Sequence, residues 1–211
     1  LDPLDATGIN GAAGDPDTDS LTNAGEFSAG TDPRNPDTDG DTPLDGADLA
    51  GITPVLVRVE GEPPTGIPDA DIAYDVLGDV HSYLDSSFGR DGIDGAGGTM
   101  TAVVRYCERA SECPFSGSYW SVQDQRAVFG DGLARADDIV AHEAMHGLIS
   151  FEAGLLPWGE PGSVAEALAD YLGEMVDQEN GRGDDSQGVR WLIGEDVSVL
   201  RDMADPASLG H

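Results

Sequence analysis

The segment DIVAHEAMHGLI, residues 138–149, carries two histidines and a glutamate at a spacing that suits a metal ion. His142 and His146 lie four positions apart, so on a helix both imidazoles face the same side and can bind one ion. Glu143 lies one position round from that face, where its carboxylate can take a proton from a metal-bound water. A buried helix with two hydrogen-bonded histidines is the alternative, and apolar neighbours place the motif at the edge of a core.

A second pair of carboxylates follows in the helical pattern of residues 163–176. Glu166 and Asp170 are again four positions apart, among mostly apolar neighbours. A catalytic zinc takes three protein ligands and keeps one open position, so Glu166 is the predicted third ligand. Asp170 is predicted to accept the second N–H of a zinc-bound imidazole. Two carboxylates on a solvated helix face are the alternative, but the cost of burying unpaired charges favours one bound zinc ion.

These two motifs belong to a wider resemblance. Together with GSYWSVQDQRAVFGDG, WLIGEDV and LRDMADPASLG, they resemble the thermolysin family of zinc endopeptidases over about residues 67–211. The resemblance implies an α+β fold of the zincin type, with a small sheet and long zinc-bearing helices. It also implies a peptide or protein substrate, a hydrophobic specificity pocket, and hydrolysis by a metal-activated water with Glu143 as general base. Substrate is expected to add a strand to the sheet edge, in contact with Gly117, Ser118 and Trp120.

The same resemblance implies structural calcium close to the zinc. The positions that match are Asp138, Asp177 and Glu195. A single calcium is expected there rather than a pair. Ordinary acidic residues at helix ends are the alternative interpretation of these positions.

Two departures from the family pattern concern the stabilisation of the oxyanion. Pro157 stands where the family has a tyrosine, and the chain ends at His211 before a downstream histidine can follow. We therefore expect a C-terminally truncated catalytic domain that binds zinc and has weak or no peptidase activity as these residues alone. The alternative is a calcium-binding or adhesion module on a catalytically incomplete zincin scaffold.

Residues 1–50 contain a repeated pattern of oxygen-bearing side chains. The pattern matches positions 1, 3, 5, 9 and 12 of a calcium-binding loop and recurs 22 residues later. The residues are Asp15, Asp17, Asp19, Asn23 and Glu26 in the first loop and Asp37, Asp39, Asp41, Asp45 and Asp48 in the second. The segment resembles thrombospondin type 3 calcium repeats, so two or more structural calcium ions are expected. A solvated acidic run is the alternative.

The composition restricts the class of partner and the compartment. With 41 acidic and 10 basic residues the net charge is −31, which argues against nucleic acid and anionic membranes as partners. Salt adaptation and heavy calcium loading both fit this charge. No apolar run is long enough to span a membrane, a signal peptide is expected to be absent from these residues, and no pattern predicts an oligomeric state. Cys107 and Cys113 would be free thiols in a reducing compartment and a short-loop disulfide in a secreted protein, which is the location we expect.

Three regions follow from these patterns. We predict a calcium-repeat segment over residues 1–50, a linker over 51–66 and a metallopeptidase domain over 67–211. Apolar periodicity predicts a helix over 69–88, and β-branched runs predict strands over 55–60, 101–106 and 126–129.

Overall fold

The computed structural model describes residues 8–10, 14–19, 22–23, 32–36, 55–107, 113–155 and 159–208. The chain forms two compact units, residues 1–55 with 107–113, and residues 56–106 with 114–211. Several predicted residues lie outside the described ranges: Glu26, Asp37, Asp39, Asp41, Asp45, Asp48, Pro157 and His211. In the first unit the described residues include one short helix, η1 (Gly8–Asn10).

The division between the two units falls within residues 51–66, the range expected to be a linker. From Leu56 onward the chain belongs to the second unit. The predicted strand over residues 55–60 is wrong, because these residues pair with no strand in the part of the chain that the structure describes. A strand is stable only when its backbone hydrogen-bonds to a neighbouring strand. Here Arg58 contacts Asp71 and Tyr74 on a helix instead, and holds the segment there.

That helix is α3 (Pro68–Phe88), which matches the predicted range within one residue. Its buried side chains recur every three or four positions and include Ala73, Val76, Val80 and Leu84. Pro68 is the first residue of the helix. Proline is favourable there, because the first N–H groups of a helix have no partner within it and proline has no N–H. Gly89 ends the helix in the left-handed conformation, and its N–H donates to the carbonyl of Asp85 at 2.8 Å.

A small sheet packs beside the helices. Its strands are β1 (Ala102–Val103), β2 (Ser118–Ser121) and β3 (Arg126–Phe129), in the order β1-β3-β2. β1 runs parallel to the buried central strand β3, and β2 runs antiparallel to it with Ser118 opposite Phe129. Within the described residues β2 is therefore an edge strand. The predicted strand over 101–106 is shorter than expected, and a separate pair, β4 (Leu192–Ile193) with β5 (Arg201–Asp202), lies downstream.

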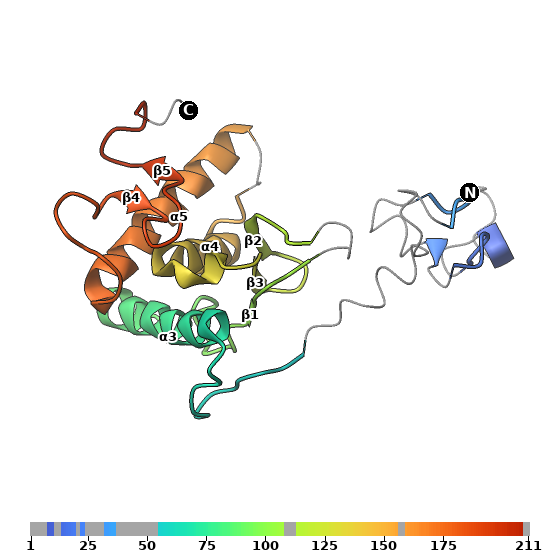
Figure 1. The fold of residues 1–211 in the computed structure, drawn as a ribbon, viewed down its shortest axis with the longest axis horizontal. Coiled ribbons are helices and arrows are strands. Elements are labelled where there is room, and N and C mark those ends of the chain that lie inside the picture. Colours follow the sequence, from blue (N-terminus) through green and yellow to red (C-terminus); the bar gives the residue numbers. More distant parts are fainter. Residues whose placement is uncertain are drawn as a thin grey trace. The chain divides into compact units, whose positions relative to one another are not determined.

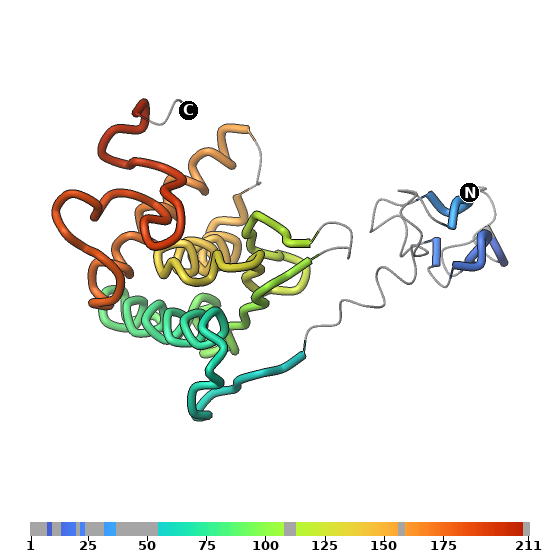
Figure 2. The backbone as a smooth tube through the Cα atoms, in the orientation of Figure 1, coloured from blue at the N-terminus to red at the C-terminus, as the bar shows by residue number. Residues whose placement is uncertain are grey.

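The core of the second unit is built around α4 (Asp137–Glu152), which follows the short helix η3 (Leu133–Arg135). α4 packs between α3 and α5 (Gly159–Asn180), and the sheet covers a further side (Figure 1). The backbone trace in Figure 2 follows the same order, with α4 in the interior. A helix covered on so many sides must be apolar almost all round, and α4 buries Ile139, Val140, Ala144 and Met145.

The backbones of α4 and α5 approach closely at Gly173. A Cβ atom at this position would lie 3.0 Å from the amide nitrogen of His142 and 3.2 Å from the carbonyl oxygen of Asp138. Any side chain would have to push the two helices apart. Glycine therefore brings the two helices that carry the zinc motifs into direct contact.

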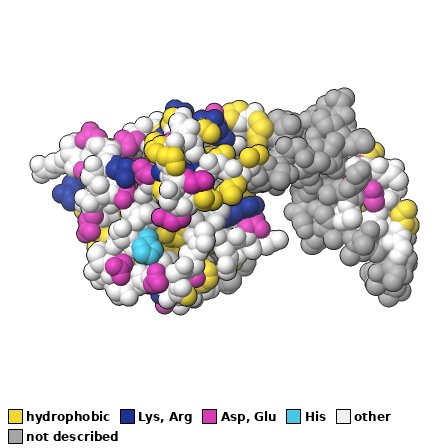
Figure 3. Space-filling view, turned by 90° about the horizontal axis from the view of Figure 1, so that it is seen from below, with side chains coloured by type: hydrophobic (Ala, Val, Ile, Leu, Met, Phe, Trp, Pro, Cys, Tyr) yellow, Lys and Arg dark blue, Asp and Glu magenta, His cyan; other side chains and the backbone are white. Residues whose placement is uncertain are grey.

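On the face drawn in Figure 3, acidic side chains are scattered among apolar and basic ones rather than gathered into one patch. Among the described residues, no helix combines the length and apolar character that crossing a membrane requires.

Candidate active site

The predicted zinc ligands meet at one point between α4 and α5. The Nε2 atoms of His142 and His146 lie 3.0 Å apart, so both rings turn this nitrogen toward the same point. Glu166 places Oε1 3.3 Å from Nε2 of His146 and Oε2 3.6 Å from Nε2 of His142. One ligand atom from each of the three residues lies within 4.8 Å of the others. Two imidazoles and one carboxylate on converging helices are a donor set that fits a zinc ion.

The charges at this point favour a cation. The hydrogen bond to His146 holds the pKa of Glu166 below its ordinary value, more strongly than partial burial raises it. Burial lowers the pKa of His146, but the hydrogen bond to Glu166 and the charges of Glu143 and Asp170 outweigh it and raise that pKa. The shift of His146 comes from the negative groups Glu166, Glu143 and Asp170 around its ring, and such an environment suits a divalent cation.

Asp170 supports the first histidine from behind. Its Oδ1 lies 2.8 Å from Nδ1 of His142, on the side of the ring opposite the converging Nε2 atoms. Burial raises the pKa of Asp170, but hydrogen bonds from His142 and Arg201 outweigh it and lower that pKa. The carboxylate therefore stays charged and can fix the imidazole in the tautomer that presents Nε2 to a metal.

Arg201 is a member of the site that the sequence did not single out. From β5 it contacts Asp170 with two nitrogens, at 2.8 Å and 2.5 Å. The residue lies within the segment LRDMADPASLG that carries the family resemblance, but no local spacing links it to Asp170. Only the fold of the second unit brings this guanidinium to the metal ligands.

Glu143 is 5% exposed and borders a cavity of about 310 Å³ beside the metal ligands. Burial raises its pKa, while the positive potential of His142 and a hydrogen bond from Ser118 oppose the rise. Apolar side chains from β2 and α4, from the segments that follow them and from the β4–β5 region line much of the cavity: Trp120, Val122, Ile139, Ile149, Leu155, Ile193 and Leu200. The site thus joins a buried carboxylate to an apolar pocket.

The three residues predicted to contact substrate are placed differently. Ser118 and Trp120 line the cavity, whereas Gly117 is not among its lining residues. A Cβ at Gly117 would lie 2.7 Å from the ring of Phe115, so the packing of that ring accounts for glycine here. The Trp120 ring lies against Gly147 of α4, where a Cβ would meet it at 2.8 Å.

A second group of carboxylates lies at the start of α4. Oxygens of Asp138, Glu174 and Glu195 lie within 4.8 Å of one another. Burial is the main cause of raised pKa values in all three, to about 6 for Asp138 and about 8 for Glu174 and Glu195. Glu174 is fully buried, and among the described residues its Oε1 has no hydrogen-bond partner. Buried carboxylates without partners are costly, so the group fits a calcium ion.

The sequence grouped Asp177 with Asp138 and Glu195 as possible calcium ligands. In the structure the oxygens of Asp138 and Glu195 lie within 4.8 Å of an oxygen of Glu174, a residue that the sequence analysis did not name. Asp177 lies beside Asp137 and Asp185, and burial together with these charges raises its pKa to about 10. Within the described residues neither carboxylate oxygen of Asp177 has a hydrogen-bond partner. The sequence analysis did not identify Glu174, because its position on α5 matches no motif. An acidic residue among apolar neighbours on this helix was the one sign that it could bind a metal.

Part of the first predicted calcium loop is described in the smaller unit. Oxygens of Asp15, Asp17 and Asp19 lie within 4.8 Å of one another. Oδ1 of Asp15 accepts the N–H of Thr18 at 2.8 Å, which bends the loop. Desolvation and the charge of Asp19 raise the pKa of Asp17. The side chain of Asn23 donates to the carbonyl of Ile9 at 2.9 Å.

The two cysteines are joined in the structure. Cys107 and Cys113 form a disulfide with 5.4 Å between their Cα atoms. The loop between them, residues 108–112, lies outside the described ranges.

Residues 68–150 match the family model of the thermolysin metallopeptidase catalytic domain. The chain is 34% identical over 169 residues to a zinc metalloproteinase of Renibacterium salmoninarum, covering 73% of this chain and 30% of that protein. It is 32% identical over 167 residues to an extracellular metalloprotease of Pectobacterium carotovorum subsp. carotovorum, covering 72% and 46%. Among solved structures it is similar to the precursor of protealysin, a metalloproteinase from Serratia proteamaculans, with a TM-score of 0.52 and 32% identity over 58% of this chain and 38% of that one.

These similarities confirm the predicted fold class, an α+β zincin fold of the thermolysin type. The chain spans less than half the length of each of these relatives.

Proposed function

We propose that the second unit of this chain is the zinc-binding part of a thermolysin-type endopeptidase that hydrolyses peptide bonds in proteins. The observation that carries the proposal is the position of Glu143. Its buried carboxylate follows His142 directly and borders the apolar cavity next to the three metal ligands. Two relatives, named a zinc metalloproteinase and an extracellular metalloprotease, support the same function.

Each residue of the site has a role in this proposal. His142, His146 and Glu166 hold the ion, and Asp170 positions His142. Zinc bound there supplies a Lewis acid that polarises the scissile carbonyl and acidifies water. Glu143 accepts a proton from the attacking water and passes it to the leaving amine. Burial raises the pKa of Glu143, which strengthens this carboxylate as a proton acceptor.

The substrate is an extended peptide with an apolar side chain. β2 is an edge strand, and Ser118 and Trp120 on it line the cavity, so a substrate backbone that pairs with β2 passes beside Glu143. The apolar lining, which includes Ile139, Ile193 and Leu200, suits a branched or aromatic side chain.

We also propose that the chain binds structural calcium and that it is secreted. We assign one calcium to Asp138, Glu174 and Glu195, with Asp177 close by on the same helix, and further calcium to the repeat that contains Asp15. Location outside the cell is supported by the disulfide, since such bonds persist in oxidising compartments. The name of the relative from Pectobacterium, an extracellular metalloprotease, points the same way.

Metal analysis combined with one substitution tests the function. We expect one zinc per chain, zinc-dependent binding of a peptide hydroxamate with an apolar side chain, and at most weak hydrolysis of a quenched fluorescent peptide by these residues alone. Glu143→Gln is expected to keep the zinc and to lower hydrolysis by about 10²–10⁴-fold. Glu160→Gln, an exposed acid in the first turn of α5, is the matched control. A chain without stoichiometric zinc, or hydrolysis unaffected by Glu143→Gln, contradicts the proposal.

A further inference from the structure

The loop that follows α5 bends at two glycines. α5 ends at Asn180, and Gly181 and Gly183 have φ angles of 70° and 60°, in the left-handed region that glycine adopts readily. We call residues 181–185 the strap. Residues 182–185 form no backbone–backbone hydrogen bond with any other residue that the structure describes. The strap is therefore held mainly by side chains, and a segment held in this way can open without unfolding the helices beside it.

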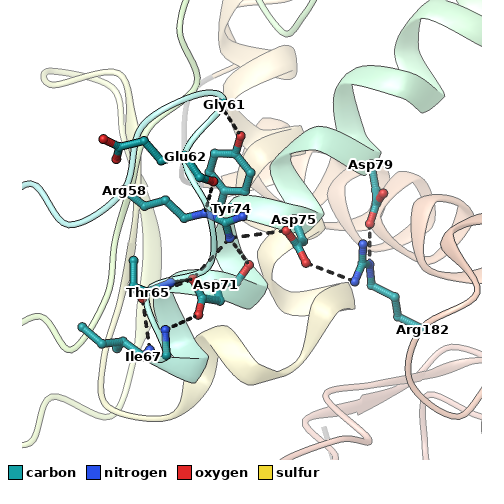
Figure 4. A network of polar contacts seen from close by, with 11 residues as sticks. Arg58, Gly61, Glu62, Thr65, Ile67, Asp71, Tyr74, Asp75, Asp79 and Arg182 are labelled. Carbon is teal, nitrogen blue, oxygen red and sulfur yellow. Dashed lines mark hydrogen bonds and ion pairs between the residues drawn. The ribbon is translucent and has the colours of Figure 1, made fainter.

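Arg182 attaches the strap to α3 (Figure 4). Its Nε atom donates to Oδ2 of Asp79 at 2.7 Å, and one terminal nitrogen lies 3.4 Å from Oδ2 of Asp75. The backbone N–H of Arg182 donates to the side-chain oxygen of Asn180 at 2.6 Å. The Arg182 side chain is 42% exposed, so solvent and salt weaken both ion pairs. The attachment is specific in geometry and modest in strength.

The α3 side of this attachment is fixed by a second arginine. Figure 4 shows Asp75 between Arg58 and Arg182. The other carboxylate oxygen of Asp75 lies 3.5 Å from the guanidinium of Arg58, which lies 3.7 Å from the centre of the Tyr74 ring. Only 9% of the Arg58 side chain is exposed, and a stacked, buried guanidinium is a firm contact. The contact that can give way is therefore the one that Arg182 makes.

The strap also meets carboxylates near the start of α4. Asn180 donates to Oδ2 of Asp137, the first residue of α4, at 2.9 Å. At Gly183 a Cβ atom would lie 2.8 Å from Oδ2 of Asp196 and 3.3 Å from Oδ1 of Asp137. The backbone of the strap therefore packs directly on two carboxylates, with no room for a side chain between them.

Asp185 brings a further negative charge to this place. It is half buried, whereas the other four residues of the strap are exposed. Burial is the main cause of the raised pKa values of Asp177, to about 10, and of Glu174, to about 8, and the charge of Asp185 adds to both. Asp177 is 1% exposed, and neither of its carboxylate oxygens has a hydrogen-bond partner among the described residues. Closing the strap thus brings like charges together, a cost that a bound cation removes.

We propose that the strap closes over the start of α4 when calcium binds there, and that Arg182 is the residue that holds the closed position. The calcium is the one assigned to Asp138, Glu174 and Glu195. It neutralises charge near Asp185, so the ion and Arg182 stabilise the same arrangement. Two groups that favour one conformation strengthen each other, because the free-energy coupling between them is reciprocal. The inference rests on the calcium assignment made with the proposed function and not on peptide hydrolysis.

Loss of Arg182 should weaken calcium binding at the start of α4, although Arg182 is not a ligand. At low calcium it should also leave the strap open in a larger fraction of molecules. Added salt should act in the same direction, because it screens the ion pairs of Arg182 with Asp75 and Asp79. This effect of salt on the strap should be smaller once Arg182 has been replaced.

Hydrogen exchange of the full chain, followed by mass spectrometry, tests the strap directly. Calcium is titrated, and the protection of amides in residues 181–185 gives a local midpoint that calcium bound in the first unit does not obscure. Arg182→Ala should raise this midpoint by about five-fold or more, and Arg182→Lys, which keeps the charge, should restore most of the loss. Asp79→Asn should raise the midpoint similarly and add little to Arg182→Ala. Arg126→Ala, which removes an ion pair with Asp124 at 3.1 Å, is the matched control and should leave the midpoint unchanged.

The inference is overturned by strap protection that does not depend on calcium in the parent chain. Equal midpoints in the parent chain and Arg182→Ala, or an equal shift in Arg126→Ala, overturn it too. Should Arg182→Ala not fold, Asp79→Asn takes its place, because it weakens the shorter ion pair from the α3 side. Failure of the proposed endopeptidase function would appear elsewhere, as a parent chain without stoichiometric zinc or hydroxamate binding whose strap still responds to calcium.

Discussion

Oδ1 of Asp170 lies 2.8 Å from Nδ1 of His142, so a carboxylate on α5 orients a metal ligand on α4. Asp170→Asn keeps the size of the side chain but removes the charge that holds the imidazole tautomer. We expect zinc affinity to fall by about 10–100-fold, as for other residues that support a metal ligand. Competition for zinc with a chromophoric chelator measures the effect.

The control for Asp170→Asn is Asp91→Asn, since Asp91 is exposed and far along the chain from the metal ligands. Unchanged circular dichroism in both variants separates a local effect from unfolding. Equal zinc affinity in Asp170→Asn and the parent chain would show that Asp170 plays no part in holding His142.

The buried carboxylates at the start of α4 predict an unusual dependence of stability on pH. Folding raises the pKa of Asp138 to about 6 and those of Glu174 and Glu195 to about 8. A carboxyl whose pKa is higher in the folded protein stabilises the fold below its unfolded pKa, and this contribution is lost as the pH rises through the folded value. In chelator, the Tm should therefore fall by roughly 5 °C or more between pH 5 and pH 8.

Calcium should reverse this trend, because a cation stabilises the ionised carboxylates. Its effect on Tm is expected to be small at pH 5 and large at pH 8. Glu174→Gln should raise the Tm in chelator at pH 8 and reduce the gain from calcium, whereas Glu179→Gln, an exposed acid on the same helix, should do neither. A Tm in chelator that rises steadily from pH 5 to pH 8 would contradict the assignment.

Gly147 allows the Trp120 ring to lie against the zinc helix. A Cβ at Gly147 would be 2.8 Å and 2.9 Å from two ring atoms of Trp120 and 3.0 Å from Ile93. Gly147→Ala favours the helix by up to about 1 kcal/mol, but overpacking costs about 1–3 kcal/mol. We expect a net loss of stability and a shift in tryptophan fluorescence, both measured during urea unfolding.

Gly78 provides the comparison for Gly147→Ala. It also lies within a helix, α3, but a Cβ there meets no atom within 4 Å. Gly78→Ala should stabilise the chain by about 0.5–1 kcal/mol. Stabilisation of similar size at both positions would mean that Trp120 does not pack tightly on α4.

The smaller unit gives a prediction about stoichiometry. Asp17 lies in the group with Asp15 and Asp19, and within the described residues its two carboxylate oxygens lack hydrogen-bond partners. Asp17→Asn should remove one calcium per chain in isothermal titration calorimetry, since it removes a charge at the centre of the loop. Zinc content should stay the same, and loss of zinc together with calcium would contradict the assignment of separate sites.

The convergence of the candidate zinc ligands was predictable because each pair of residues is local in the sequence. His142 and His146 are related by one helical turn, as are Glu166 and Asp170, so the sequence alone places each pair on one face. The only long-range step, the meeting of α4 and α5, follows from the chemistry of a metal that needs three ligands. Helix α3 was predictable for the same reason, since its buried positions follow the helical period.

The sequence-based predictions failed where a residue's structure depends on contacts with residues far away in the chain. Residues 55–60 have the composition of a strand. In the structure Arg58 instead stacks on the Tyr74 ring and forms an ion pair with Asp71, and no described strand pairs with residues 55–60. Arg201 contacts Asp170, and Glu174 lies beside Asp138 and Glu195. Neither contact follows from the spacing of these residues in the sequence. A sequence motif reports which groups can do chemistry, and non-local packing decides which further groups surround them.

Gly173 has a consequence for how this metal site could be adjusted. At this residue the two helices that carry the ligands are separated by no side chain, so their spacing is set by backbone thickness alone. A single methyl group there would push the two helices apart and so move Glu166 away from both histidines, although all three side chains would still be present. The position therefore acts as a spacer, because the size of the residue there sets how far the carboxylate on one helix lies from the two imidazoles on the other.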